Sequence, residues 1–252
     1  MTTDDVVVDV SQDWVLACDV QQRFMQGLRR TSDSVDRSAQ CRQVRALGGN
    51  CYDFVPLTDH RLGLVVWRCF RQRCRRGAMI PSVQPSLWTA ALFTGNDPAA
   101  LLKIVNLQAY ASSLADHYAT VFYGVFDRLT RMLRYVNAGH TPPVVLRRNG
   151  SIDTLGTDGA PVEMFPDSSY EEGVVQLDPG DVVITCTDGV IEAANQSGEE
   201  WGVQGLLKAT AAWARQGTEN AEHLVRSIFN SMDDFSKGCQ TDDATLAVLR
   251  VL

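Results

Sequence analysis

A carboxylate at the end of a predicted buried strand is the first candidate for chemistry in this sequence. The apolar, β-branched run from Val182 to Thr187 predicts that strand, which stops at Asp188-Gly189. The sheet would hold the carboxylate in place, and a residue without Cβ would let backbone and water approach, which suits a hard cation. The alternative is an ordinary strand-to-turn Asp-Gly pair, which this dipeptide favours when taken alone.

Composition limits the class of protein. The chain has 252 residues, enough for one large domain or two small ones, and its apolar and charged fractions of 45% and 21% are those of a soluble globular protein. A net charge of −7 argues against a nucleic-acid partner. We expect a cytoplasmic protein without a membrane partner, because the chain has no long apolar run, no basic leader and only scattered cysteines.

Periodicity divides the chain into an acidic, partly apolar tail over residues 1–13 and a single domain over residues 14–252. Helices are predicted over 14–28, 98–115, 203–215 and 220–235, with Asp97 as the N-cap of the second. Strands are predicted over 61–66, 119–127, 131–137, 143–147, 174–177, 182–187 and 244–251, with a hairpin turn at Asn149-Gly150. These patterns alone predict only a mixture of α and β structure.

Several short motifs follow one another in a specific order. The strand ending at Asp188 is preceded by Asn137-Ala-Gly139-His140-Thr-Pro-Pro143 and Gly180-Asp181, and it is followed by Thr241-Asp242-Asp243-Ala244-Thr245. In this order and spacing the motifs resemble the PPM (PP2C-like) serine/threonine phosphatases, in the bacterial sporulation-stage-II-E and RsbU branch. The resemblance runs from about Val20 to Leu252. It implies an α+β fold, the PP2C-like α-β-β-α sandwich of two antiparallel sheets flanked by helices.

The resemblance also implies a site for two Mn²⁺ or Mg²⁺ ions with Asp53, Asp188 and Asp242 as ligands. All three are expected at strand ends, where a two-sheet fold can bring them together, and purely oxygen ligands suit these metals. Asn50, Gly189 and Asp243 would lie at the periphery, Asn50 being a neutral amide where the family has an acid. Metal-activated water would attack the phosphoryl group without a protein nucleophile. The alternative is that these carboxylates only cap turns.

Other motif residues have structural interpretations. Asn137, Gly139 and His140 are expected to form a tight loop, an interpretation we favour over His140 as a general acid. Asp158 to Glu163 resembles a family segment in which glycine is usual at the position of Glu163. Glu192 is expected to be a surface or capping residue.

The most diagnostic family motif, G-D-V-S-G-K-G, is missing. The chain instead has Trp67-Arg68-Cys-Phe-Arg71-Gln-Arg73-Cys-Arg-Arg-Gly-Ala78, so Arg68 stands at the position of the metal-bridging aspartate and Arg71 and Arg73 replace glycines. With one choice of synonymous codons for Trp67 to Ala78, a one-base shift of reading frame gives G-D-V-S-G-K-G-V-A-A-A-L. A compensated frameshift is therefore one hypothesis for this segment.

If the arginines are real, the segment is expected to be a loop or a frayed helix start. Alternatively, the arginines with the interleaved Trp67 and Phe70 could bind phosphate or nucleic acid. Cys69 and Cys74 could bind a metal, although no second pair of cysteines or histidines has zinc spacing. A positive Arg68 predicts poor metal binding and little turnover.

Three hypotheses result. The first is a metal-dependent protein-serine/threonine phosphatase, whose substrate by family likeness is a phosphorylated anti-sigma-factor antagonist of the STAS type. The second is a pseudophosphatase that binds a partner without catalysis, and the third is a module that binds phosphate or nucleic acid through the arginine run.

Overall fold

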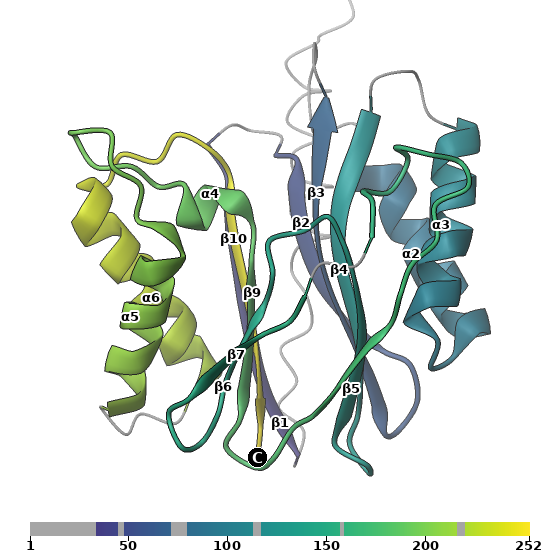
Figure 1. The fold of residues 1–252 in the computed structure, drawn as a ribbon, viewed down its shortest axis with the longest axis horizontal. Coiled ribbons are helices and arrows are strands. Elements are labelled where there is room, and N and C mark those ends of the chain that lie inside the picture. The colour runs from purple at the N-terminus through teal and green to yellow at the C-terminus, as the bar shows by residue number, and fades with distance from the viewer. Residues whose placement is uncertain (1–33, 45–47, 72–79, 113–116, 157–158, 216–219) are drawn as a thin grey trace, which may run out of the picture.

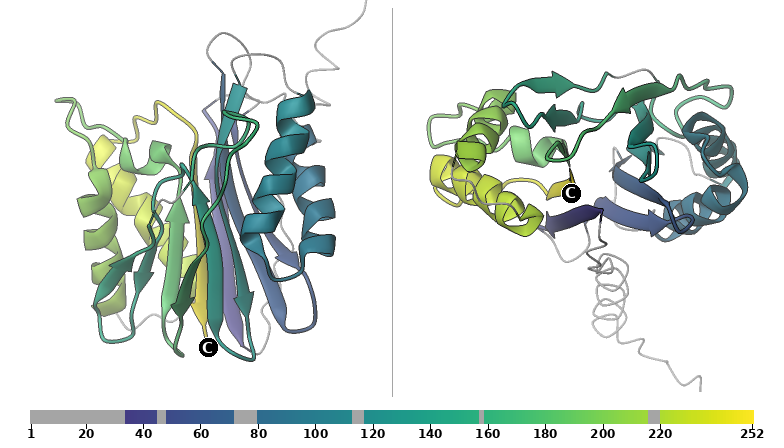
Figure 2. Two further views of the ribbon diagram at one scale, coloured as in Figure 1. Left: turned by 45° about the vertical axis from the view of Figure 1, so that its right-hand side comes forward. Right: turned by 90° about the horizontal axis from the view of Figure 1, so that it is seen from below.

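A computed structural model describes residues 34–44, 48–71, 80–112, 117–156, 159–215 and 220–252. The predicted tail over 1–13, the predicted helix over 14–28 and Arg73 lie outside these residues. Two five-stranded antiparallel sheets pack face to face, with helices on both outer faces (Figures 1 and 2). This arrangement confirms the expected α-β-β-α sandwich.

The first sheet, called sheet A, has the strand order β1-β10-β9-β6-β7. Its strands are β1 (Val35–Arg42), β6 (Val144–Leu146), β7 (Ile152–Thr154), β9 (Val182–Cys186) and β10 (Ala244–Val251). Every residue of β9 is buried, because this strand lies between β10 and β6 and is covered on both faces. Strand β1, at the edge of the sheet, is not anticipated by the sequence analysis.

The second sheet, called sheet B, has the strand order β2-β3-β4-β5-β8. Its strands are β2 (Asn50–Pro56), β3 (Arg61–Arg71), β4 (His117–Asp127), β5 (Met132–Ala138) and β8 (Gly173–Gln176). The strands predicted over 119–127 and 131–137 form the antiparallel hairpin of β4 and β5, which lies near the centre of this sheet.

Two pairs of helices cover the sheets. Helices α5 (Gly202–Arg215) and α6 (Ala221–Ser236) lie on sheet A, and α2 (Ile80–Thr94) and α3 (Pro98–Ser112) lie on sheet B, while the short α4 (Asp188–Ile191) follows β9 (Figure 1). Asp97 caps α3 as predicted, since its Oδ1 accepts a hydrogen bond from Ala100 N at 2.8 Å. Helix α2 forms although Pro85 lies inside it. Among the described residues, no helix is both long and apolar enough to cross a membrane.

Three apolar layers form the core, and alternate residues of each strand face different layers. Leu62, Leu64 and Val66 of β3 face the layer between the two sheets, whereas Val65, Trp67 and Cys69 face α2 and α3. Residues 67–71 therefore continue the strand, and the predicted loop or frayed helix start is wrong for this part of the segment. The alternation persists through Cys69, and every residue of β3 pairs with β4 up to Arg71 and His117.

Candidate active site

The carboxylate of Asp188 lies where β9 turns into α4, at one end of sheet A. Gly189 is needed there, because a Cβ at this position would lie 2.2 Å from the carbonyl oxygen of Asp243. The missing side chain lets α4 pack directly on the segment that enters β10. This close contact brings Asp188 and Asp242, which are far apart in the sequence, to the same end of the sheet.

Arg68 lies between these two carboxylates. Its Nη1 is 3.2 Å from Asp188 Oδ2 and its Nη2 is 2.6 Å from Asp242 Oδ2. The arginine side chain is only 7% exposed, whereas those of Asp188 and Asp242 are 32% and 29% exposed. Arg68 belongs to β3 and both aspartates belong to the end of sheet A, so the guanidinium joins the two sheets. The guanidinium also lies over the ring of Phe70, 4.6 Å from its centroid.

Asn50 and Asp243 form a buried hydrogen-bond network beside this bridge. Asn50 pairs with Arg68 across β2 and β3, and its Nδ2 donates to Thr187 Oγ1 at 3.0 Å and to the Asp243 carbonyl at 2.7 Å. The carboxylate of Asp243 accepts backbone hydrogen bonds from Val44 at 2.8 Å and Gly49 at 3.0 Å. Asp243 thus holds the chain that leads into β2.

Asp53 is not brought together with Asp188 and Asp242. It lies inside β2 rather than at a strand end, and the neighbouring residues Tyr52 and Phe54 face the layer between the sheets. Asp53 therefore faces the helices, where its Oδ2 accepts a hydrogen bond from Trp88 Nε1 of α2 at 2.9 Å. Its Oδ1 accepts a bond from Phe54 N at 2.7 Å.

Asn137, Gly139 and His140 build a tight loop at the end of β5. Asn137 Oδ1 accepts a hydrogen bond from His140 N at 2.8 Å, and Gly139 has a φ of 68° with Pro161 packed where a Cβ would point. The His140 ring is buried and lies 3.1 Å from Thr120 Oγ1. Burial and the nearby Arg68 lower its pKa to about 4, although Asp188 opposes this, so the imidazole is neutral at pH 7.

Thr141 is a site residue that the sequence analysis missed. Its hydroxyl donates a hydrogen bond to Asp188 Oδ1, the oxygen that does not face Arg68. The sequence feature that could have identified Thr141 is its position directly after His140, in a motif whose other residues build the loop. Glu192 lies one turn beyond Asp188, and partial burial and the Asp188 charge raise its pKa.

These residues do not fit a pair of divalent ions. Among the described residues, no three His, Cys, Asp or Glu side chains form a cluster that could hold a metal ion. The two converging carboxylates each bind Arg68, so a fixed positive charge occupies the space between them. Asp53, the third carboxylate named by the resemblance, has other partners on the opposite face of sheet B.

Most of the chain matches the profile of a known protein family. The sequence profile of the family described as Stage II sporulation protein E (SpoIIE) matches residues 77–252, well over half of the chain. The chain belongs to the SpoIIE family. The profile match begins after most of the arginine-rich segment of this SpoIIE-family chain.

Two curated relatives come from Bacillus subtilis. The chain is 24% identical to phosphoserine phosphatase RsbP over 167 residues, which is 64% of this chain and 41% of RsbP. It is 26% identical to phosphoserine phosphatase RsbU over 160 residues, which is 62% of this chain and 46% of RsbU. The SpoIIE-family chain thus spans less than half the length of the curated relatives it matches.

Solved structures share its PP2C-like fold. The SiaA-PP2C domain of Pseudomonas aeruginosa superposes with a TM-score of 0.80 at 17% identity, over 96% of each chain. The catalytic domain of the serine/threonine phosphatase PstP, in complex with two manganese ions, superposes with a TM-score of 0.63 at 16% identity, over 87% of this chain and 99% of that domain. Manganese is thus bound by a protein with this fold, whereas Arg68 lies between the converging carboxylates here.

Proposed function

We propose that this SpoIIE-family chain is a pseudophosphatase, a domain that binds a phosphoserine-signalling protein without efficient hydrolysis. The observation that carries the proposal is the buried guanidinium of Arg68 between Asp188 and Asp242. Family membership supports the signalling role, and the contacts of Arg68 support the loss of hydrolysis.

The electrostatic reason is direct. Two unit charges about 4 Å apart interact by roughly 4 kcal/mol at an effective dielectric constant of 20, and a divalent ion doubles this value. Arg68 would repel such an ion by that amount, and it also occupies one oxygen of each converging carboxylate. The carboxylates that would attract a cation are therefore already neutralised in part.

The proposed partner is a phosphorylated anti-sigma-factor antagonist of the STAS type. The family resemblance implies this class of substrate, and the relatives RsbP and RsbU are named phosphoserine phosphatases. The partner class is thus proposed from likeness and not from contacts of this chain.

A second candidate is the metal-dependent hydrolase itself, which the frameshift hypothesis for residues 67–78 would favour. With one choice of synonymous codons for Trp67 to Ala78, a one-base shift of reading frame gives G-D-V-S-G-K-G with its aspartate at position 68. In that form Mn²⁺ or Mg²⁺ would supply the activated water, and Asp188 and Asp242 would be the proposed ligands from sheet A.

The test compares three chains: the wild type, Arg68→Asp, and a variant in which residues 67–78 are replaced by G-D-V-S-G-K-G-V-A-A-A-L. Calorimetric titration with Mn²⁺ and hydrolysis of a phosphoserine peptide are measured for each. We expect Mn²⁺ binding and at least a roughly 100-fold gain in turnover with the restored segment, because the bound ions supply metal-assisted attack. Arg68→Asp should give weaker binding and a smaller gain, because it removes the repelling charge but leaves Arg71 and Arg73 in place.

Metal-dependent turnover by the wild type at the rate of the restored chain would refute the pseudophosphatase. Direct sequencing of codons 60–90 then decides between the candidates for the natural gene. A gene that encodes Trp67 to Ala78 as written supports the pseudophosphatase, and one that encodes G-D-V-S-G-K-G supports the hydrolase. Binding of a phosphorylated STAS-domain protein by the wild-type chain tests the partner.

A further inference from the structure

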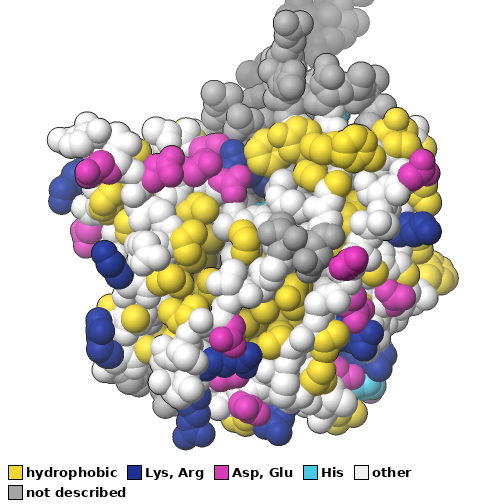
Figure 3. All heavy atoms as spheres, in the orientation of Figure 1, with side chains coloured by type: hydrophobic (Ala, Val, Ile, Leu, Met, Phe, Trp, Pro, Cys, Tyr) yellow, Lys and Arg dark blue, Asp and Glu magenta, His cyan; other side chains and the backbone are white. Residues whose placement is uncertain are grey.

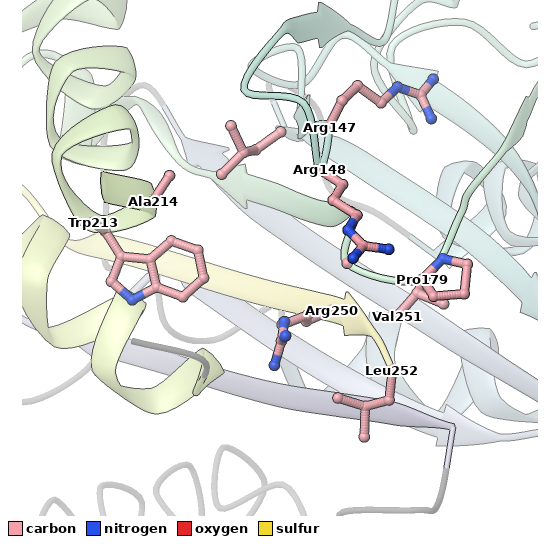
Figure 4. Close-up of a pocket in the computed structure, with 10 residues that line it drawn as sticks. Arg147, Arg148, Pro179, Trp213, Ala214, Arg250, Val251 and Leu252 are labelled. Atoms are coloured by element: carbon pink, nitrogen blue, oxygen red, sulfur yellow. The ribbon is translucent and has the colours of Figure 1, made fainter. Parts of the chain in front are cut away.

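A pocket of about 360 Å³ lies at the end of sheet A opposite the candidate active site (Figure 4). Its walls are the β6–β7 turn, the turn before β9, the last turn of α5 and the end of β10. They include Arg147, Arg148, Pro179, Trp213, Arg250 and Leu252. Strand β10 starts near Asp242 and ends at this pocket, so the two places are roughly 25 Å apart.

The pocket has a positive lining in an acidic protein. Three arginines line it and none of its lining residues is acidic, although the whole chain carries a net charge of −7. Several Lys and Arg side chains are visible along this lower edge of the molecule, with Asp and Glu side chains among them (Figure 3).

One buried carboxylate organises this end of the molecule. The side chain of Asp181 is buried, since the residue is only 3% exposed. Its Oδ2 accepts hydrogen bonds from Arg147 Nη1 at 2.8 Å and from Asp178 N at 3.0 Å. Its Oδ1 accepts a hydrogen bond from Arg148 N at 2.9 Å. Arg147 is therefore a structural residue, bound also to Asp153 at 2.7 Å. The neighbouring residue Arg148 does not share this structural role.

The Arg148 guanidinium makes no ion pair with any residue that the structure describes, and Arg148 is exposed. Its aliphatic part lies against Gly180, where a Cβ would be 3.2 Å from Arg148 Cδ. Gly180 has a φ of 98°, which a larger residue rarely adopts. The turn thus supports the Arg148 stem and leaves its charge at the pocket.

The opposite wall is apolar. Figure 4 shows the indole of Trp213 across the pocket from Arg148 and Arg250, with Leu252 at the rim. Trp213 is 5% exposed, and its Nε1 has no hydrogen-bond partner within the described part of the chain. A pocket with guanidinium groups on one side and apolar side chains on the other suits a segment that carries both acidic and apolar residues.

The chain itself contains such a segment outside the described residues. Residues 4–10 read Asp-Asp-Val-Val-Val-Asp-Val. The described chain starts at Ser34, whose carbonyl oxygen accepts a hydrogen bond from Leu252 N at 3.0 Å, and Leu252 lines the pocket. Even with the predicted helix over 14–28, residues 11–33 can span roughly 50 Å, so residues 4–10 can reach the pocket from its rim.

We propose that this pocket binds the acidic segment Asp4–Val10 of the same chain. Each exposed ion pair contributes little, but a short tether raises the local concentration of the segment to about the millimolar range. Docking would be weakened by salt, because Arg148 is exposed and its attraction is screened. The proposal is independent of the active site and does not require hydrolysis or metal.

Hydrogen–deuterium exchange of the full chain tests the proposal. In low salt we expect amides of residues 4–10 to exchange at least about tenfold more slowly than in a peptide of residues 1–13, because docking protects them. Arg148→Glu should abolish this protection. A second variant with Asp4→Asn, Asp5→Asn and Asp9→Asn should abolish the protection as well, because it removes the acidic charges of the segment.

Arg215→Glu is the matched control, because Arg215 ends α5 close to the pocket but does not line it. This control should keep full protection. Unprotected residues 4–10 in the wild type would overturn the proposal, as would protection that survives Arg148→Glu. Protection that disappears on dilution would assign the segment to a second copy and would equally overturn docking within one chain.

Discussion

Replacing Arg68 by methionine tests the reasoning about the buried bridge. Methionine keeps much of the apolar stem of arginine but removes the guanidinium that binds Asp188 and Asp242. The two carboxylates would then face each other without a cation, so we expect the free energy of unfolding to fall.

The magnitude follows from the contacts and the burial. Two close charge pairs contribute roughly 8 kcal/mol of gross attraction at an effective dielectric constant of 20, but burying the guanidinium costs several kcal/mol. Asp188 and Asp242 are 32% and 29% exposed, so both regain hydration when the arginine is removed. We therefore expect a loss of about 2–3 kcal/mol, below the roughly 3–5 kcal/mol typical of a fully buried pair. In a chain of this size that lowers Tm by about 4–12 °C.

Urea unfolding and scanning calorimetry measure the effect. Arg226→Met is the control for an exposed pair, because Arg226 Nη2 lies 3.4 Å from Glu222 Oε1 and the two side chains are 63% and 44% exposed. This control should lose at most about 1 kcal/mol. An Arg68→Met chain as stable as the wild type would refute the reasoning, since it would show that desolvation of the arginine cancels its attraction.

Three further substitutions test individual contacts. Glu163 has a φ of 71°, so Glu163→Gly should raise the free energy of unfolding by about 1 kcal/mol, measured in urea; a decrease would contradict the strain. Gly189→Ala should lower it by about 1–3 kcal/mol or more, because the new Cβ would meet the Asp243 carbonyl, and an unchanged Tm would refute this close contact. Burial opposes ionisation of Asp181, but hydrogen bonds from Asp178 N, Arg147 and Arg148 N outweigh it and lower its pKa. The ionised carboxylate therefore stabilises the fold at any pH above the ordinary pKa of an aspartate. The free energy of unfolding of the wild type should exceed that of Asp181→Asn at pH 7, and this difference should shrink below about pH 4, as the pH falls through the lowered pKa. A difference that stays constant from pH 7 to pH 2 would contradict this prediction.

Local patterns in the sequence predict many of the helices and strands, but not how they are arranged. The β-branched run before Asp188 forms the buried strand β9, Asp97 caps α3, and Asn149-Gly150 turns the hairpin of β6 and β7. These features depend on residues close together in the chain, so periodicity, capping and turn chemistry are sufficient to find them. Strand β1 has only one fully buried residue, Val35, and therefore lacks the strong pattern that reveals the other strands.

The sequence by itself also determined that Arg68 stands where the family motif has an acid. It determined as well that Asp188 follows one strand and that Asp242 precedes another. It did not decide which carboxylates meet. Asn50 and Asp53 are three residues apart on one strand, so the pleat directs them to opposite faces of sheet B, one toward Thr187 and the other toward Trp88. Only the packing of the two sheets decided that Arg68 lies between Asp188 and Asp242, because those contacts join residues more than a hundred positions apart.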